Sequence, residues 1–285
     1  MIITLKNEFA CVQIDSLGAQ LRRWTDENAE MLWCGRADVF DGVAPILFPF
    51  CGKLHDGAYR HGGKTFHMNI HGFARQMNFA VIHASDTEAC FRLTDDERTR
   101  KIYPFPFSLT IRYALQGHAL SVDFTVKNCG REPMPFSLGA HYAFAAPGGV
   151  PGCEIVFEKP IELFHHELDA EGLLTGNQRK IPTRGEVLFP DYSICENNSW
   201  VFLNLEQHAC TFINKAGQHI LIEFPDSSAL VLWTPPDAEL LCIEPWNGRP
   251  DSTDGLPEQL TEKPDVILLA PGEEKTVSHT LSHVK

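Results

Sequence analysis

Apolar and polar residues alternate in short runs along most of the chain, and turn residues separate one run from the next. Residues 119–127 are the clearest example, with apolar side chains at positions 120, 122, 124 and 126. Successive side chains of a strand point to opposite faces, so this period of two predicts a strand with one buried face.

Several neighbouring runs are close enough in sequence to pair as hairpins. Residues 2–5 and 9–14 flank a polar turn at 6–8, and residues 108–115 precede 119–127 across a turn that contains a glycine. β-Branched and aromatic residues dominate these runs, as is typical of strands. Further strands are predicted at residues 66–70, 79–83, 89–93, 155–157, 200–205, 211–214, 219–224, 229–233, 240–243 and 276–281.

No long window carries apolar residues at the helical spacing, although a short helical turn is predicted near residues 36–40. The 19 prolines and 21 glycines are spread evenly, without a linker or a repeat. Many short strands without helices between them favour an antiparallel sandwich over a parallel α/β sheet. The sequence therefore predicts an all-β fold, a large antiparallel β-sandwich, with residues 1–285 in a single domain.

Charge narrows the range of partners. The 285 residues include 24 Lys and Arg against 37 Asp and Glu, a formal net charge of −13. Nucleic acids and anionic membranes are bound by basic surfaces, so neither is expected as a partner. The same charge repels phosphorylated metabolites at long range, and a phosphate would need a local cluster of Lys and Arg.

The N-terminus and the cysteines indicate a soluble, cytoplasmic protein. Charge occurs too early in residues 1–9 for a signal peptide. The longest apolar stretch, residues 43–51, is too short to span a bilayer and contains two prolines. The nine cysteines show no C-x-x-C spacing and mostly lie among apolar residues, so buried reduced thiols are expected rather than disulfides or a zinc site.

Three polar residues stand in short apolar segments that contain Gly or Pro. His71 opens the segment HGFAR, His141 ends SLGAH, and Glu244 opens EPWNG. A partly buried imidazole or carboxylate needs a partner, or its pKa shifts. If the three converge, they can deliver one proton and remove another, which is acid–base chemistry without a metal or cofactor. The structural alternatives are histidines bonded to the backbone and a glutamate in a buried ion pair.

Four further residues are candidates for binding a ligand, and each has a structural alternative. Lys53 ends an apolar stretch, where it either donates to a ligand oxygen or is solvated. Arg75 either offers a fork of donors to a ligand or lies on the surface. Trp233 either faces a ring-shaped ligand or belongs to the core. Asp191 either accepts from ligand hydroxyls or caps a turn.

Five other histidines raise the question of a metal site. His165 and His166 are adjacent, so in a strand their rings would point to opposite faces. Together with His55, His61 and His67 they form no H-E-x-x-H or similar spacing. No catalytic metal is therefore predicted.

When these segments are compared together, the sequence resembles the aldose 1-epimerases (galactose mutarotases), most closely their shorter bacterial branch. The order and spacing of HGFAR, the G-x-H segment and the EPW segment carry the likeness, which covers nearly the whole chain. The resemblance implies the galactose mutarotase-like supersandwich. The matching segments are residues 17–20, 31–33, 45–50 with 52–53, 71–75, 103–105, 128, 134–141 with 144, 243–246 with 248, and 269–273.

The resemblance also implies roles for the site residues and no cofactor. Glu244 falls at the family's general base, which takes the proton from the C1 hydroxyl of a sugar. His141 falls at the general acid, which protonates the ring oxygen, and His71 at a second histidine that binds the substrate. Position 53 is Lys where this branch often carries Arg, which replaces a planar fork by a point donor.

The sequence leaves three functions open. The first is interconversion of the anomers of a free aldose, with a small-molecule sugar as partner and the protein a monomer or homodimer. The second is a hexose-6-phosphate 1-epimerase, in which Lys53 and Arg75, with or without Arg249, would converge on the phosphate. The third is a carbohydrate-binding protein without turnover, which would not need a proton donor opposite a proton acceptor.

Overall fold

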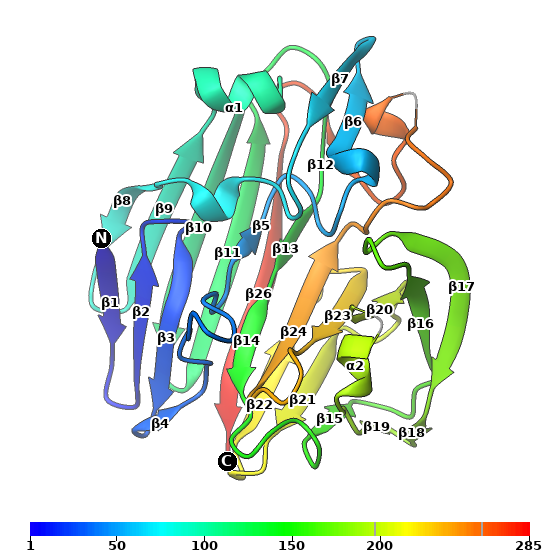
Figure 1. The fold of residues 1–285 in the computed structure, drawn as a ribbon. Coiled ribbons are helices and arrows are strands. Elements are labelled where there is room, and N and C mark those ends of the chain that lie inside the picture. Colours follow the sequence, from blue (N-terminus) through cyan, green and yellow to red (C-terminus); the bar gives the residue numbers. More distant parts are fainter. Residues whose placement is uncertain (197, 258) are drawn as a thin grey trace.

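The computed structural model describes residues 1–196, 198–257 and 259–285 and consists mostly of antiparallel strands (Figure 1). The largest sheet has ten strands and is antiparallel throughout. In spatial order they are β18 (Thr183–Arg184), β19 (Val187–Leu188), β15 (Glu154–Phe157), β21 (Ala209–Ile213), β22 (His219–Glu223), β26 (Glu274–Val284), β11 (Ala119–Asn128), β10 (Phe107–Gln116), β9 (Glu88–Thr94) and β8 (Ala80–Ala84).

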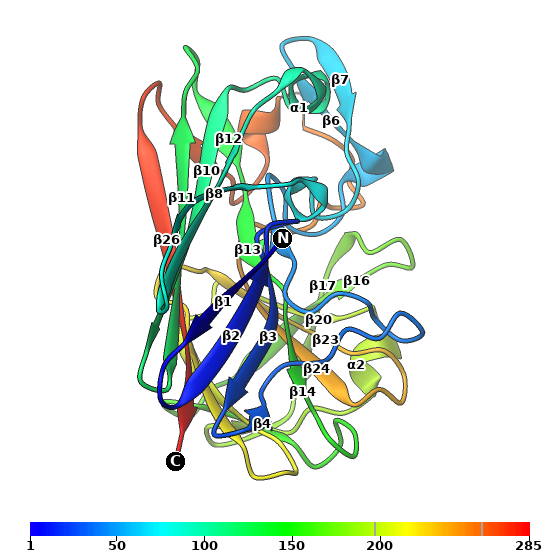
Figure 2. The same ribbon diagram turned by 90° about the vertical axis from the view of Figure 1, so that its left-hand side faces the viewer.

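Two smaller sheets form the other layer. The first runs in the order β20 (Trp200–Leu203), β23 (Ala229–Trp233), β24 (Leu240–Asn247), β13 (Leu138–Ala140) and β5 (Ile46–Leu47), with β14 (Tyr142–Ala145) also paired to β24. The second consists of β1 (Ile2–Lys6), β2 (Ala10–Asp15), β3 (Gln20–Asp26) and β4 (Ala29–Glu30). Figure 2 shows β10, β11 and β26 in one layer and β3, β14 and β24 in the other.

The remaining elements are short. Three strand pairs complete the sheets: β6 (Ala58–His61) with β7 (Lys64–His67), β12 (Met134–Phe136) with β25 (Ile267–Leu269), and β16 (Leu163–Leu168) with β17 (Leu174–Ile181). The helices are α1 (Glu97–Ile102), α2 (Ser193–Glu196) and 3-10 turns at His55–Gly57, Ala74–Gln76 and Leu260–Glu262. Within the described residues, no helix has the length and apolarity that crossing a membrane requires.

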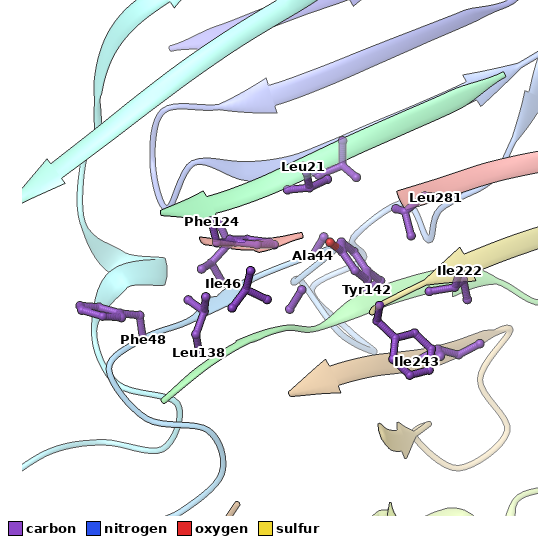
Figure 3. Packing of buried hydrophobic residues seen from close by; sticks show 14 of the residues in the cluster. Leu21, Ala44, Ile46, Phe48, Phe124, Leu138, Tyr142, Ile222, Ile243 and Leu281 are labelled. Atoms are coloured by element: carbon purple, nitrogen blue, oxygen red, sulfur yellow. The ribbon is translucent and has the colours of Figure 1, made fainter. Parts of the chain in front are cut away.

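The core lies between the two layers. Every second residue of β10 and β11 is buried, as the period of two requires. Phe124 of β11 belongs to the same buried cluster as Ile46, Leu138, Tyr142 and Ile243 from the opposite layer, and Figure 3 shows these side chains together. The predicted all-β antiparallel sandwich is confirmed.

The strands that sequence patterns missed lack alternation. All but the last residue of β14 are buried, so its sequence Tyr-Ala-Phe-Ala shows no polar face. β17 is mostly exposed and polar, and it forms because β16 lies beside it. The predicted strand at 66–70 is instead the end of β7, which stops at His67. The predicted helical turn near 36–40 is one turn closed by the Phe40 N–H bond to Arg36 O, at 2.8 Å.

One histidine, His279 of β26, is buried in the core with both ring nitrogens bonded. Its Nδ1 lies 3.1 Å from the Tyr142 hydroxyl, and its Nε2 lies 3.1 Å from Ser227 Oγ. Burial lowers the pKa of His279 to about 3. The folded protein therefore keeps this ring neutral at pH values where the unfolded chain protonates it.

Stability should consequently fall as the pH drops from about 6.5 toward 3, because the unfolded state then binds a proton that the folded state does not. His279→Gln keeps hydrogen-bonding capacity without titrating. It should lower stability at pH 7 by about 1–3 kcal/mol and reduce the pH slope by up to about 1.4 kcal/mol per unit. Urea unfolding between pH 7 and 4 measures both. The exposed His219 supplies the control His219→Gln, and an unchanged slope in His279→Gln would contradict the assignment.

Candidate active site

All the predicted site residues except Asp191 line one cavity of about 340 Å³. Its floor is β24, and its walls come from chain segments near residues 40–53 and 70–75 and from the turn between β16 and β17. This volume lies within the range of small-ligand sites. The predicted residues that it brings together are Lys53, His71, Arg75, His141, Trp233 and Glu244.

Glu244 lies in the middle of β24, a strand that is buried on both faces except at its last residue. Leu241 and Ile243 belong to the core between the layers. Because side chains alternate along a strand, Glu244 points to the opposite face, as Cys242 and Trp246 do. One face of β24 therefore closes the sandwich, and the other forms the floor of the cavity.

His141 stands between β13 and β14 and faces Glu244 across the cavity floor. Its Nε2 lies 3.4 Å from Glu244 Oε1, and its backbone N–H donates to Pro45 O at 3.1 Å. Phe40 stacks on the imidazole at 5.4 Å, and Trp233 meets it edge-on at 5.8 Å between ring centroids. His141 Nδ1 and Glu244 Oε2 are buried without a hydrogen-bond partner, so both groups retain unused capacity for a ligand.

Burial controls the protonation of this pair. It raises the pKa of the Glu244 carboxyl well above its ordinary value. The nearby indole N–H of Trp246 lowers this pKa slightly, although it does not form a hydrogen bond. Burial lowers the pKa of His141 to about 3, a shift that its own backbone opposes and the charge of Arg75 reinforces. Burial therefore favours the uncharged form of each group, the carboxylic acid and the imidazole. The 3.4 Å contact is short enough for a proton to pass between the two groups, which would turn the neutral pair into an ion pair.

His71 is held in a strained backbone conformation beside this pair. Its φ is 66°, in the left-handed region that non-glycine residues rarely adopt. Its N–H donates to Gly52 O at 3.0 Å, and Gly52 N–H donates to His71 Nδ1 at 3.1 Å. Since Nδ1 accepts, the ring proton resides on Nε2, and burial lowers the pKa of His71 well below its ordinary value. The result is a fixed neutral donor whose ring stands 5.8 Å from that of His141.

The two cations of the cavity differ in how they are paired. Lys53 Nζ forms an ion pair with Glu171 Oε2 at 2.7 Å, and Glu171 also lines the cavity. Arg75 Nη2 donates to Ile70 O at 3.1 Å, while its buried Nε has no partner. Burial lowers the pKa of the Arg75 guanidinium. Arg249 does not line this cavity and is instead paired with Asp265.

Asp191 lies outside the cavity, on the surface at the start of α2. Its Oδ1 accepts from the backbone N–H of Ser193 at 2.8 Å and from the Ser193 hydroxyl at 2.6 Å. The structure thus places it in the turn-capping role that was its structural alternative. Sequence patterns did not single out Phe40 and Glu171, which line the cavity. No pattern in the neighbouring sequence indicates that Phe40 or Glu171 lines the cavity, because both are in loops that approach β24 only in the folded chain.

The cavity floor also contains a combination of groups that could ligate a metal. Ligand atoms of His141, Cys242 and Glu244 lie within 4.8 Å of one another. Metal ligation by a cysteine needs a thiolate, but burial raises the pKa of the Cys242 thiol well above its ordinary value. The group is therefore better suited to holding a proton than a metal. Among the described residues, none of the five histidines considered earlier belongs to such a group.

Comparison with known proteins decides the family. The model of the family described as Aldose 1-epimerase matches residues 1–282. The chain belongs to the aldose 1-epimerase family. This confirms the resemblance inferred from the HGFAR, G-x-H and EPW segments.

Relatives of this aldose 1-epimerase family member match along its full length. The chromosomal protein LacX of Lactococcus lactis is 28% identical, and the match covers 99% of each chain. A galactose mutarotase-related enzyme from Lactobacillus acidophilus has a TM-score of 0.93 at 25% identity, covering 100% of this chain and 98% of the other. A galactose mutarotase-like protein from Lactobacillus casei has a TM-score of 0.93 at 28% identity, with 100% of both chains covered.

The strained turn at His71 gives a test of how this family member positions its site. A Cβ at Gly72, whose φ is +71°, would lie 2.2 Å from Phe48 O. Gly72→Ala should therefore lower the free energy of unfolding by roughly 3 kcal/mol or more, from clash and strain together. Gly62→Ala is the matched control, because Gly62 has φ +55° and nothing within 4 Å of its Cβ. It should cost only about 1 kcal/mol. Equal losses in urea unfolding would contradict this account of the turn.

Proposed function

We propose that this protein is an aldose 1-epimerase that interconverts the α and β anomers of a sugar by opening and closing its ring. The observation that carries the proposal is the 3.4 Å contact between Glu244 Oε1 and His141 Nε2 on the floor of the cavity. O1 and the ring oxygen O5 of a pyranose are bonded to the same carbon, C1. A base and an acid this close can therefore reach both oxygens of one sugar.

The reaction needs both groups at once. Glu244 takes the proton from the O1 hydroxyl while His141 donates a proton to O5. The C1–O5 bond breaks, leaving an aldehyde at C1 and a hydroxyl at C5. After rotation about C1–C2 the C5 hydroxyl adds to the other carbonyl face, and the two protons return. Either transfer alone would leave a high-energy charge on the sugar, and each positioned transfer is worth roughly 10²–10⁴-fold in rate.

Sugar binding prepares the pair for this chemistry. Burial favours the uncharged forms of Glu244 and His141, whereas a base and an acid require the carboxylate and the imidazolium. A hydroxyl donating to Glu244 stabilises the carboxylate, and an ether oxygen accepting from His141 stabilises the imidazolium. The substrate thus supplies the hydrogen bonds that burial removes. Since the pair titrates as one unit, activity should depend on pH with a bell-shaped profile.

The other lining residues have binding roles in this proposal. His71 offers its Nε2–H to a sugar oxygen, and the unpartnered Nε of Arg75 offers a second donor. The indole of Trp233, with Phe40 at 5.1 Å, gives an apolar wall for a sugar face. Asp191 receives no role, because it does not line the cavity.

The proposal is tested by isosteric substitution of the base. Glu244→Gln removes the proton acceptor and should lower kcat by at least about 10²–10⁴-fold, with sugar binding retained. His141→Asn should cost a similar factor. Anomer exchange of glucose and galactose followed by NMR gives the rates, and Glu8→Gln, on an exposed turn, is the control. Full activity in Glu244→Gln would refute the base assignment. A wild-type protein that binds sugar without accelerating exchange would favour the carbohydrate-binding alternative.

The cations at the cavity argue against a phosphorylated substrate. A hexose 6-phosphate would need Lys53 and Arg75 to converge on the phosphate, but Lys53 is paired with Glu171, and Arg249, the further candidate, lies outside the cavity. The net charge of −13 adds long-range repulsion. A free aldose therefore fits the cavity better.

Releasing Lys53 from its ion pair should weaken the discrimination against phosphorylated sugars. Glu171→Gln removes the partner of Lys53 and one negative charge from the cavity, so glucose 6-phosphate should inhibit anomer exchange about 2–5-fold more strongly. That range corresponds to an exposed ion pair of about 0.5–1 kcal/mol. Glu8→Gln makes the same change in net charge elsewhere and should leave inhibition unchanged. Equal inhibition of the wild type and Glu171→Gln would show that Glu171 does not set the preference.

A further inference from the structure

Three residues far apart in sequence meet at the end of the molecule that carries the hairpin between β10 and β11. Asp26 ends β3, His118 lies in the turn after β10, and His283 lies near the end of β26. His118 Nδ1 is 2.9 Å from both carboxylate oxygens of Asp26, and His283 Nδ1 is 2.9 Å from Asp26 Oδ1. All three ligand atoms lie within 4.8 Å of one another. None of these residues lines the cavity described above.

Asp26 is a buried carboxylate whose partners are these two imidazoles. Its side chain is 0% exposed, against 26% for His118 and 14% for His283. In the described part of the chain, no Lys or Arg forms an ion pair with it. A buried carboxylate needs a nearby positive charge or a full set of hydrogen bonds. A divalent cation between the three groups would supply that charge.

We propose that Asp26, His118 and His283 form a binding site for a divalent transition metal of the zinc class. Two imidazole nitrogens and one carboxylate oxygen are ligands that zinc accepts at about 2.0–2.2 Å. Atoms at that distance from one ion are about 2.9 Å apart at a right angle and about 3.3 Å apart at the tetrahedral angle. The observed nitrogen-to-oxygen separations of 2.9 Å fit these values, and the two imidazole nitrogens, which lie within 4.8 Å of each other, would close onto the same ion. The partial exposure of His118 provides an entry path and leaves a position for water.

The backbone holds the three ligands together before any metal binds. His283 N–H donates to His118 O at 3.2 Å, and Asn7 Nδ2 donates to Gly117 O at 2.9 Å. β11 and β26 pair directly beside this point, with Ala119 opposite Ser282. A site built on paired strands loses little entropy when it binds. The metal would tie the N-terminal sheet to the last strand of the ten-stranded sheet, so its role is stability rather than catalysis.

Zinc binding to protein stripped of metal tests the proposal directly. Isothermal titration with zinc should show one equivalent bound with a Kd in the micromolar range or tighter. His118→Gln and His283→Gln should each lose that binding, while His219→Gln, at an exposed position of β22, should retain it. A zinc concentration of one hundred times Kd should raise the Tm of the wild type by roughly 5 °C, and the first two variants should lose this shift.

Further controls separate this site from the cavity. His141→Asn should still bind zinc, and cobalt(II) should give absorption bands without a sulfur-to-metal transition, because the set contains no cysteine. Loss of binding in His141→Asn, or a cobalt–thiolate band, would move the metal to His141, Cys242 and Glu244 and overturn the proposal. Absence of saturable binding, or equal binding by His118→Gln and the wild type, would also overturn the proposal. Asp26 would then be held only by its hydrogen bonds to His118 and His283. None of these outcomes depends on epimerase activity.

Discussion

The proposed chemistry of this protein depends on the burial of one carboxyl group against one imidazole. Both side chains are buried, so a charge on Glu244 or on His141 alone is unfavourable. A charge on one is tolerable only when the other carries the opposite charge 3.4 Å away. In the proposed mechanism the two groups therefore act as a unit, and the hydrogen bonds of a bound sugar stabilise their charged forms.

The sandwich creates this constraint through a single strand. β24 is held by β23 on one side and by β13 and β14 on the other, and the pairing on that second side is interrupted only opposite Glu244 and Pro245. One of its faces closes the core through Leu241 and Ile243, and the other presents Glu244 to the cavity. The break between β13 and β14 places His141 at the same level. The proposed base and acid need fixed positions because proton transfer tolerates little displacement.

The surroundings of the pair suit a neutral, hydroxyl-rich ligand. His71 is fixed as a neutral donor by its bonds to Gly52, and the charge of Lys53 is offset by Glu171 at the mouth of the cavity. Aromatic rings hold His141 in place without adding charge. The cavity thus combines a low-dielectric floor with polar donors at its rim, an arrangement in which hydrogen bonds are stronger than in water.

The sequence by itself determined the fold class and the chemical groups of the site. The period of two in β10 and β11 is a local property, and so are the Gly- and Pro-containing segments around His71, His141 and Glu244. Tertiary structure alone decided which of these groups meet. It excluded Asp191 from the cavity, brought Glu171 to Lys53, and joined Asp26 to His118 and His283. It also formed β14 and β17, whose residues show no alternation. The physical reason is that pattern and propensity act between neighbours in the chain, whereas burial and ion pairing depend on contacts between residues that are distant in sequence and close only after folding.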